Sequence, residues 1–194
     1  MVEIPTAPEV ARRLADALEQ AGVPYAVGGA IAYGLHAPPR ATNDVDINVF
    51  VDADRLEPVF DAFERAGATV DRTTAAESAR QRGDFKARAG PMRVDVFVPS
   101  IALYASAASR VREAVLLGRP IKVLSAEDLT IFKLLFFRAK DVSDVERLVA
   151  FRGDDLDRQY VREWLVALVG VEDERVAKWD VIVGRADRTG TKRP

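Results

Sequence analysis

The chain has 194 residues, of which 48% are hydrophobic, and a net charge of −2 at neutral pH, so it holds enough apolar material for a buried core. It contains no cysteine and one histidine, which excludes disulfides and thiolate chemistry and leaves few ligands for zinc. Any bound metal must therefore lie on carboxylates, and carboxylates favour Mg²⁺, with Mn²⁺ as the alternative.

Membrane association is not expected from the hydropathy pattern. The longest apolar runs, such as residues 164–169, fall far short of the roughly 20 residues that a helix needs to cross a bilayer. No positively charged segment followed by an apolar one opens the sequence, so we expect a cytoplasmic location.

Charge is unevenly distributed along the chain. Residues 72–122 hold 10 Lys or Arg against 4 Asp or Glu, whereas residues 1–71 hold 5 against 12. A basic segment of this kind is typical of proteins that bind a polyanion such as RNA, because neutralised phosphates release counterions. It is equally compatible with a solvated face that balances the acidic N-terminal segment.

The first elements surround a pair of glycines. A capping box followed by apolar residues at helical spacing predicts a helix over residues 8–21. A strand over 25–28 then ends at Gly28 and Gly29, and a brief helix over 30–36 follows directly. Glycines between a strand and a helix let backbone amides approach a phosphate, and the helix dipole favours its negative charge.

Three aspartates are expected on strands further along the chain. Asp44 and Asp46 lie two residues apart on a strand over 44–51, so their side chains share one face. Asp95 lies in the second strand of a hairpin, over 92–98, opposite the apolar face of that strand. Together the three carboxylates are typical of a site for one or two hard cations.

The rest of the chain completes an α/β (α+β) fold, a mixed sheet flanked by helices with a C-terminal helical bundle. We expect a catalytic core over 1–124 and a helical region over 125–194 that packs on it. The remaining expected elements are a helix over 54–66, a short strand over 69–71, a polar stretch to 82, a strand over 84–89, helical turns over 101–117, a strand over 120–124, and helices that begin near 126, 141, 157 and 172. The large aromatic residues expected in the core are Phe132, Phe136, Phe137, Trp164 and Trp179.

Two segments together resemble the nucleotidyltransferase superfamily, namely residues 28–32 (GGAIA) and residues 40–47 (RATNDVDI). Within it, they are most similar to the AbiEii-type and MenT-type toxins and related minimal nucleotidyltransferases. The resemblance extends to Lys133 and residues 138–144 (RAKDVSD), which are similar to the family's helical K…(R/K)-D-x-x-D segment. It implies a nucleotidyltransferase-like mixed sheet with helices around it.

The resemblance also implies roles for the residues of the first half. Gly28 and Gly29 would face the triphosphate of a nucleotide, and Asp44 and Asp46 would bind metal. Asp95 would complete the metal site and deprotonate or orient the acceptor hydroxyl. Many family members carry Gly-Ser where this chain has Gly28-Gly29, so a serine hydroxyl contact is missing here, and backbone amides would have to replace it.

In the second half, Lys133 would contact the triphosphate, and Asp144 matches a functional acid of the toxin subfamily. Arg40 would steady a phosphate or the metal-binding loop, and Thr42 belongs to the same nucleotide-binding motif. Asp141 and Asp144 also stand at the expected N-cap and N3 positions of a helix. For Asp141 the cap is the simpler explanation, whereas for Asp144 cap and catalysis both stay open.

The implied reaction is the Mg²⁺-dependent transfer of NMP from an NTP to an acceptor hydroxyl, with release of pyrophosphate. If the chain acts as the toxins do, the acceptor is RNA, with the 3′ end of tRNA foremost, and a separate antitoxin protein restrains it. Two alternatives stay open. The acceptor is a protein hydroxyl or a small molecule such as an aminoglycoside, or the chain is a catalytically silent module that binds nucleotide or RNA.

Overall fold

The computed structural model describes residues 5–189. Within this part, residues 5–32 and 39–124 form one compact unit, and residues 33–38 and 125–189 form another. Each unit is described by itself below.

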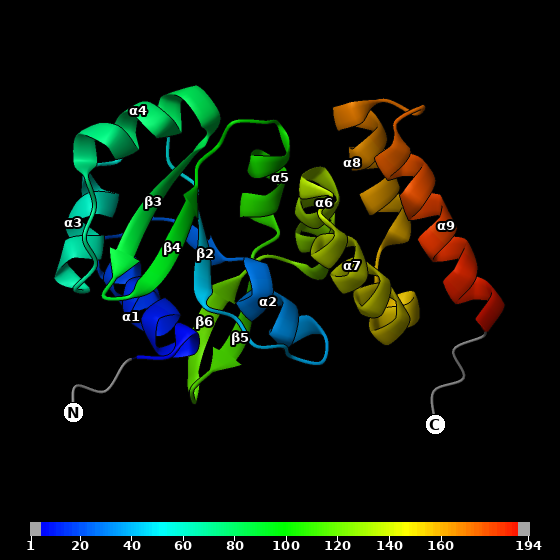
Figure 1. Ribbon diagram of the computed structural model, residues 1–194, viewed down its shortest axis with the longest axis horizontal. Coiled ribbons are helices and arrows are strands. Elements are labelled where there is room, and N and C mark those ends of the chain that lie inside the picture. The colour runs from blue at the N-terminus through cyan, green and yellow to red at the C-terminus, as the bar shows by residue number, and fades with distance from the viewer. Residues whose placement is uncertain (1–4, 190–194) are drawn as a thin grey trace. The chain divides into compact units, whose positions relative to one another are not determined.

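The first unit is built on a six-stranded mixed sheet in the order β3-β4-β2-β1-β6-β5 (Figure 1). Its strands are β1 (Tyr25–Val27), β2 (Asp44–Val49), β3 (Asp84–Ala89), β4 (Met92–Phe97), β5 (Arg112–Leu116) and β6 (Arg119–Val123). β2 runs antiparallel to β1 and parallel to β4, and β1 runs parallel to β6. β3-β4 and β5-β6 are antiparallel hairpins. The mixed sheet with its helices confirms the predicted fold class.

Helices cover the sheet of the first unit. They are α1 (Ala7–Gln20), the start of α2 (Gly29–His36), α3 (Glu57–Arg65), α4 (Arg72–Arg82) and α5 (Leu103–Ser109). α1 packs against β1, β2, β6 and α3 and buries Val10, Leu14 and Leu18, each at most 1% exposed. Burial of a side chain of this size contributes about 1.5–3 kcal/mol, so this apolar stripe fixes α1 on the sheet.

The second unit is a bundle of α6 (Ala126–Phe136), α7 (Ala139–Arg152), η1 (Gly153–Asp155), α8 (Arg158–Val169) and α9 (Glu174–Thr189) (Figure 1). α6 contacts the other three α-helices of the bundle. Ser125 caps α6, because its hydroxyl accepts the amide of Asp128 at 3.0 Å. The fully buried Asp128 in turn accepts the hydroxyl of Tyr160 at 2.7 Å, which ties α8 to the first turn of α6.

The structure contains one helix that the sequence did not predict. Residues 72–82, expected as a polar stretch, form α4. Asp71 stands at its N-cap and accepts the amide of Thr74 at 3.2 Å, so it is no strand residue, and the expected strand shrinks to a single bridge at Thr69. The helix was not predicted because it buries small side chains, such as Ala75 and Ala79, and so shows no apolar stripe.

One strand is also absent from the expectation. The helical turns expected over 101–117 are limited to α5, and residues 112–116 form β5 instead. Leu117 and Gly118 connect β5 to β6 with positive φ angles of 52° and 74°. A two-residue turn of this kind matches the twist of paired strands. Leucine is rare in such a turn, so the hairpin was not predicted from the sequence.

The aromatic residues expected in the core divide into two groups. Trp179 is 1% exposed and Phe132 is 9% exposed, as predicted. For Phe136 the expectation was wrong, because its side chain is 48% exposed. Phe137, in a left-handed conformation at the C-cap of α6, and Trp164 are only half-buried. No helix in residues 5–189 is long and apolar enough to cross a membrane.

Candidate active site

The glycine pair forms a tight turn against β2. The amide of Gly28 donates to the backbone carbonyl of Asp46 at 2.9 Å, and Gly29 opens α2 with a φ of +54°. A Cβ atom on Gly29 would lie 1.7 Å from Oδ2 of Asp46. One on Gly28 would lie 2.8 Å from the side-chain nitrogen of Asn48. Position 29 therefore requires glycine, whereas a side chain at position 28 would have to displace the amide of Asn48. The carboxylate of Asp46 lies against the first turn of α2.

The three aspartates come from two adjacent parallel strands. In the register of β2 and β4, Asp46 lies directly beside Asp95, and Asp44 lies beside Arg93. The alternating residues Val45 and Ile47 are fully buried, which holds the aspartates on the opposite face of the sheet, as alternation predicted. Since β2 and β4 are neighbours, the ladder sets the three aspartates on adjacent strands, on one face of the sheet.

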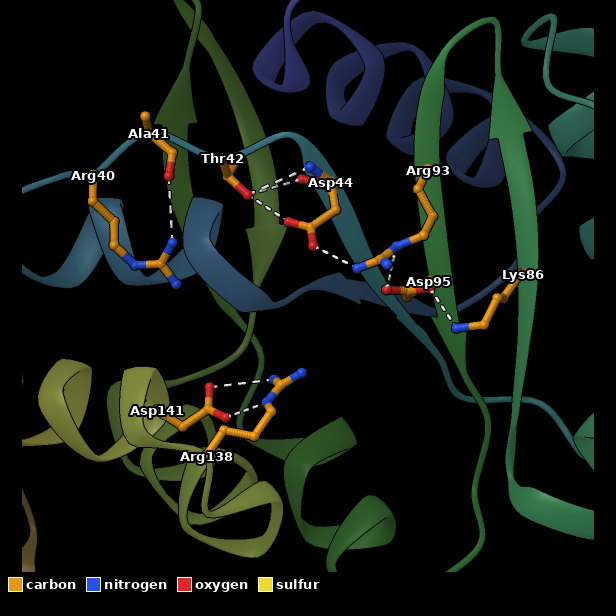
Figure 2. A network of polar contacts seen from close by, with 9 residues as sticks. All are labelled: Arg40, Ala41, Thr42, Asp44, Lys86, Arg93, Asp95, Arg138 and Asp141. Carbon is orange, nitrogen blue, oxygen red and sulfur yellow. Dashed lines mark hydrogen bonds and ion pairs between the residues drawn. The ribbon is translucent and has the colours of Figure 1, made fainter.

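Thr42 positions the first of these acids. Its hydroxyl donates to Oδ1 of Asp44 at 2.5 Å (Figure 2). Arg40, two residues earlier, donates from Nη1 to the carbonyl of Ala41 at 3.3 Å. In the structure Thr42 thus orients a carboxylate, and its role as a nucleotide contact stays a prediction, as does that of Arg40.

Two basic residues contact the acids, and the sequence reasoning did not assign them to the site. Arg93 lies on β4 and forms ion pairs with Asp44 at 2.8 Å and with Asp95 at 3.1 Å (Figure 2). Lys86 lies on β3, directly opposite Asp95 in the ladder, and its ammonium is 3.1 Å from Oδ1 of that residue. The alternation of β4 places Arg93 on the face of Asp95, and that pattern was the available indication.

The carboxylates have the chemistry that a magnesium or manganese ion requires. They supply several oxygen ligands on one face, and the lack of a side chain on Gly29 leaves room for the carboxylate of Asp46. As the side chains stand, no group of three acidic or histidine residues among residues 5–189 converges on a metal position. The guanidinium of Arg93 bridges Asp44 and Asp95. The donor set therefore fits the metal, provided that Arg93 moves away.

The second unit holds a buried ionic cluster around Lys133. Its ammonium lies 2.7 Å from Asp144 and 3.7 Å from Asp141, and 5.8 Å from the ring centroid of Tyr33. Lys133 is 4% exposed and each aspartate 2%. Lys133 lies on α6 and the two aspartates lie on α7, because α6 ends at Phe137, before the aspartates. Contact of Lys133 with a triphosphate stays a prediction.

The capping explanation for the two acids of α7 is wrong. α7 begins at Ala139 with Arg138 as its N-cap, so Asp141 lies in the first turn and Asp144 in the helix interior. Arg138 donates from Nε to Asp141 at 2.5 Å (Figure 2). Asp144 therefore does not cap the helix. Its structural role is a buried ion pair with Lys133, and a catalytic role for it stays a prediction.

No protein-family model and no curated protein sequence matches the chain, whereas solved structures do. The solution structure of the antibiotic-resistance factor ANT(2'')-Ia is similar with a TM-score of 0.57 and 16% identity, over 94% of this chain and 91% of that one. The crystal structure of ANT(2'')-Ia with adenylyl-2''-tobramycin has a TM-score of 0.50 and 18% identity, over 92% and 95%.

A third similar structure is the lincosamide antibiotic adenylyltransferase LnuA with bound lincomycin, with a TM-score of 0.52 and 15% identity, over 75% of this chain and 98% of that one. The chain has a nucleotidyltransferase-like fold. At such identities the likeness shows the fold alone, and membership of the predicted superfamily stays a prediction.

Proposed function

We propose that this protein is a Mg²⁺-dependent nucleotidyltransferase that moves NMP from an NTP to an acceptor hydroxyl. The observation that carries the proposal is the register of β2 and β4, which sets Asp46 beside Asp95, with the glycine turn against Asp46. Two parallel strands and a phosphate-compatible turn thus meet at one place. The fold shared with adenylyltransferases supports the same reaction.

In this reaction some residues bind the nucleotide and the metal, and another activates the acceptor hydroxyl. The turn at Gly28 and Gly29 binds the triphosphate with backbone amides. Asp44 and Asp46, with Asp95, hold the metal, which when bound offsets the negative charge that develops on the phosphates. The oxygen of the acceptor attacks the α-phosphorus, the bond to the β-phosphate oxygen breaks, and pyrophosphate leaves. Asp95 takes the proton of the attacking hydroxyl.

For the acceptor we propose RNA, and specifically tRNA, with the chain acting as a toxin of the AbiEii or MenT type that an antitoxin protein restrains. The motif over residues 40–47 and the basic segment over 72–122 support this choice. A small-molecule hydroxyl is the second candidate, because ANT(2'')-Ia was solved with adenylyl-2''-tobramycin and LnuA with lincomycin.

The reaction is tested with each of the four α-labelled NTPs and Mg²⁺, offered with total RNA, total protein, an aminoglycoside or a lincosamide, and followed by mass spectrometry. We expect labelled tRNA from the wild type. Asp95→Asn should lose about 10²- to 10⁴-fold in rate, which is the usual contribution of a general base, and Asp46→Asn should be inactive. Asp54→Asn is the matched control, because Asp54 is a highly exposed acid that pairs with Arg80.

The possible outcomes separate the candidates. Labelled antibiotic with unlabelled RNA would identify a small-molecule hydroxyl as the acceptor. Labelled protein would identify a protein hydroxyl. No product in any arm, or a product that Asp46→Asn forms as fast as the wild type, would overturn nucleotidyl transfer at this site. Growth of cells that express the wild type or Asp46→Asn tests the toxin role, since only the wild type should arrest growth.

A further inference from the structure

One guanidinium bridges two of the three proposed metal-binding carboxylates. Nη2 of Arg93 lies 2.8 Å from Oδ2 of Asp44, and Nε lies 3.1 Å from Oδ2 of Asp95 (Figure 2). The bridge follows from the strand register, because Arg93 is the ladder partner of Asp44 and stands two residues before Asp95. A guanidinium presents several donors in one plane, so it can contact two carboxylates together.

Both oxygens of Asp95 are engaged by cations. Oδ2 pairs with Arg93, and Oδ1 lies 3.1 Å from the ammonium of Lys86 on β3. Each oxygen keeps a second lone pair, but the two positive charges at 3.1 Å oppose the approach of a divalent cation to this carboxylate. The protein's own basic side chains therefore place positive charge beside the acids.

These contacts are arranged so that the basic side chains can leave. The side chains of Arg93 and Lys86 are 51% and 61% exposed, whereas those of Asp44 and Asp95 are 23% and 13% exposed. The acids are therefore fixed in the sheet, and the cations lie on its solvent side. Ion pairs with one exposed partner contribute little to stability, so their loss leaves the fold intact.

We propose that Arg93 is an internal counter-cation that competes with the divalent metal ion for Asp44 and Asp95. It keeps the two carboxylates close together in the metal-free protein and swings toward solvent when the ion binds. Arg93 is in this sense a positioning residue. The inference rests on the proposed function in one respect, namely that the three aspartates hold a divalent cation.

The test measures Mn²⁺ binding by electron paramagnetic resonance of the free ion, without nucleotide or acceptor. We expect Arg93→Gln to bind Mn²⁺ about tenfold more tightly than the wild type, because an opposite charge within about 4–6 Å of a carboxylate is removed. Arg88→Gln is the electrostatic control. Arg88 is the ladder partner of Arg93 on β3, and the loss of its equal charge should change the affinity less than about twofold.

Thermal melting gives an independent readout. Without metal, Arg93→Gln should melt below the wild type, since Asp44 and Asp95 have lost their shared cation, and saturating Mn²⁺ should close the difference. Arg93→Lys keeps the charge but cannot bridge two carboxylates as a planar fork does, so its affinity should lie between those of Arg93→Gln and the wild type. This second variant also serves if Arg93→Gln folds poorly.

The outcomes distinguish this inference from the proposed function. An Arg93→Gln protein that binds Mn²⁺ no better than the wild type overturns the counter-cation role. If Asp44→Asn and Asp95→Asn both bind Mn²⁺ as the wild type does, these two aspartates hold no cation and the inference fails. If the affinities change as expected while no acceptor is ever labelled, the inference stands and the proposed reaction fails.

Discussion

The ammonium of Lys133 lies 2.7 Å from the carboxylate of Asp144, although the two residues belong to different helices, α6 and α7. Both side chains are nearly inaccessible, at 5% and 3% exposure. A buried charge without its partner is costly, since the desolvation penalty then remains uncompensated. The pair is consequently a determinant of stability for the helical unit, whatever else Lys133 contacts.

Lys133→Met should lower the free energy of unfolding by about 3–5 kcal/mol, because Asp144 is left buried without its cation. Urea denaturation followed by circular dichroism measures the change. Lys178→Met is the matched control, since Lys178 forms a pair of similar length with Glu146, at 2.8 Å, but both side chains are partly exposed; it should cost less than about 1 kcal/mol. The double variant Lys133→Met/Asp144→Leu should recover most of the loss. Equal effects of Lys133→Met and Lys178→Met would contradict the assignment.

Gly29→Ala should damage the candidate site and not merely the turn. The added methyl would lie 1.7 Å from Oδ2 of Asp46, so the carboxylate has to move, and nucleotidyl transfer should be lost. Gly118→Ala separates this effect from backbone strain, because Gly118 also has a positive φ, +74°, but no atom within 4 Å of an added Cβ. It should cost about 1–2 kcal/mol in stability and leave the reaction rate unchanged. Unaltered transfer by Gly29→Ala would show that the turn tolerates a displaced Asp46.

Leu117→Asn should stabilise the protein by about 1 kcal/mol, because leucine is held there at a φ of +52° and asparagine tolerates the left-handed conformation far better. The change in the melting temperature measures it. Leu117→Ala is the comparison, since it removes the exposed apolar side chain (58% exposed) without relieving the backbone. If the two variants gain equally, exposure of the side chain and not the turn explains the effect.

Stability should fall at alkaline pH, in part because of Tyr104. Burial, and secondarily the charge of Asp84, raises the pKa of Tyr104 above its usual value. The unfolded chain therefore loses this proton near pH 10 while the folded protein keeps it, so the free energy of unfolding decreases as the pH rises beyond 10, by up to roughly 1.4 kcal/mol per pH unit for one group. Tyr104→Phe should flatten this dependence in urea titrations between pH 9 and 11. A slope that is identical in the wild type and in Tyr104→Phe would rule out the contribution.

The sequence was most informative where local backbone geometry alone determines which residue type is allowed. Glycines at 28 and 29 and the alternation around Asp44, Asp46 and Asp95 predicted the strands, the turn and the shared face, because each depends on local geometry. The ladder that sets Asp46 beside Asp95 was not predictable, since register between strands far apart in sequence depends on the whole sheet.

Each incorrect or missing prediction has a specific structural cause. α4 buries alanines and so lacks an apolar stripe, and β5 is joined to β6 through an unfavourable turn residue, Leu117. Asp141 and Asp144 have the spacing of a capping pair, but Arg138 is the N-cap, and the ion pair with Lys133 comes from a separate helix. The contact of Arg93 with Asp44 depends on the register of β2 and β4, which no motif in the sequence encodes.

The position of β4 in the sheet has a consequence for the order of assembly during synthesis. β4 lies between β2 and β3, and β3 pairs with no other strand among residues 5–189. A nascent chain that ends at β3 already carries the glycine turn, Asp44 and Asp46, yet β3 has no strand to join and Asp95 has not been made. Because distant pairing is the slow part of sheet formation, we expect the three carboxylates to come together in a single late step, so that an incomplete chain has no partially active site.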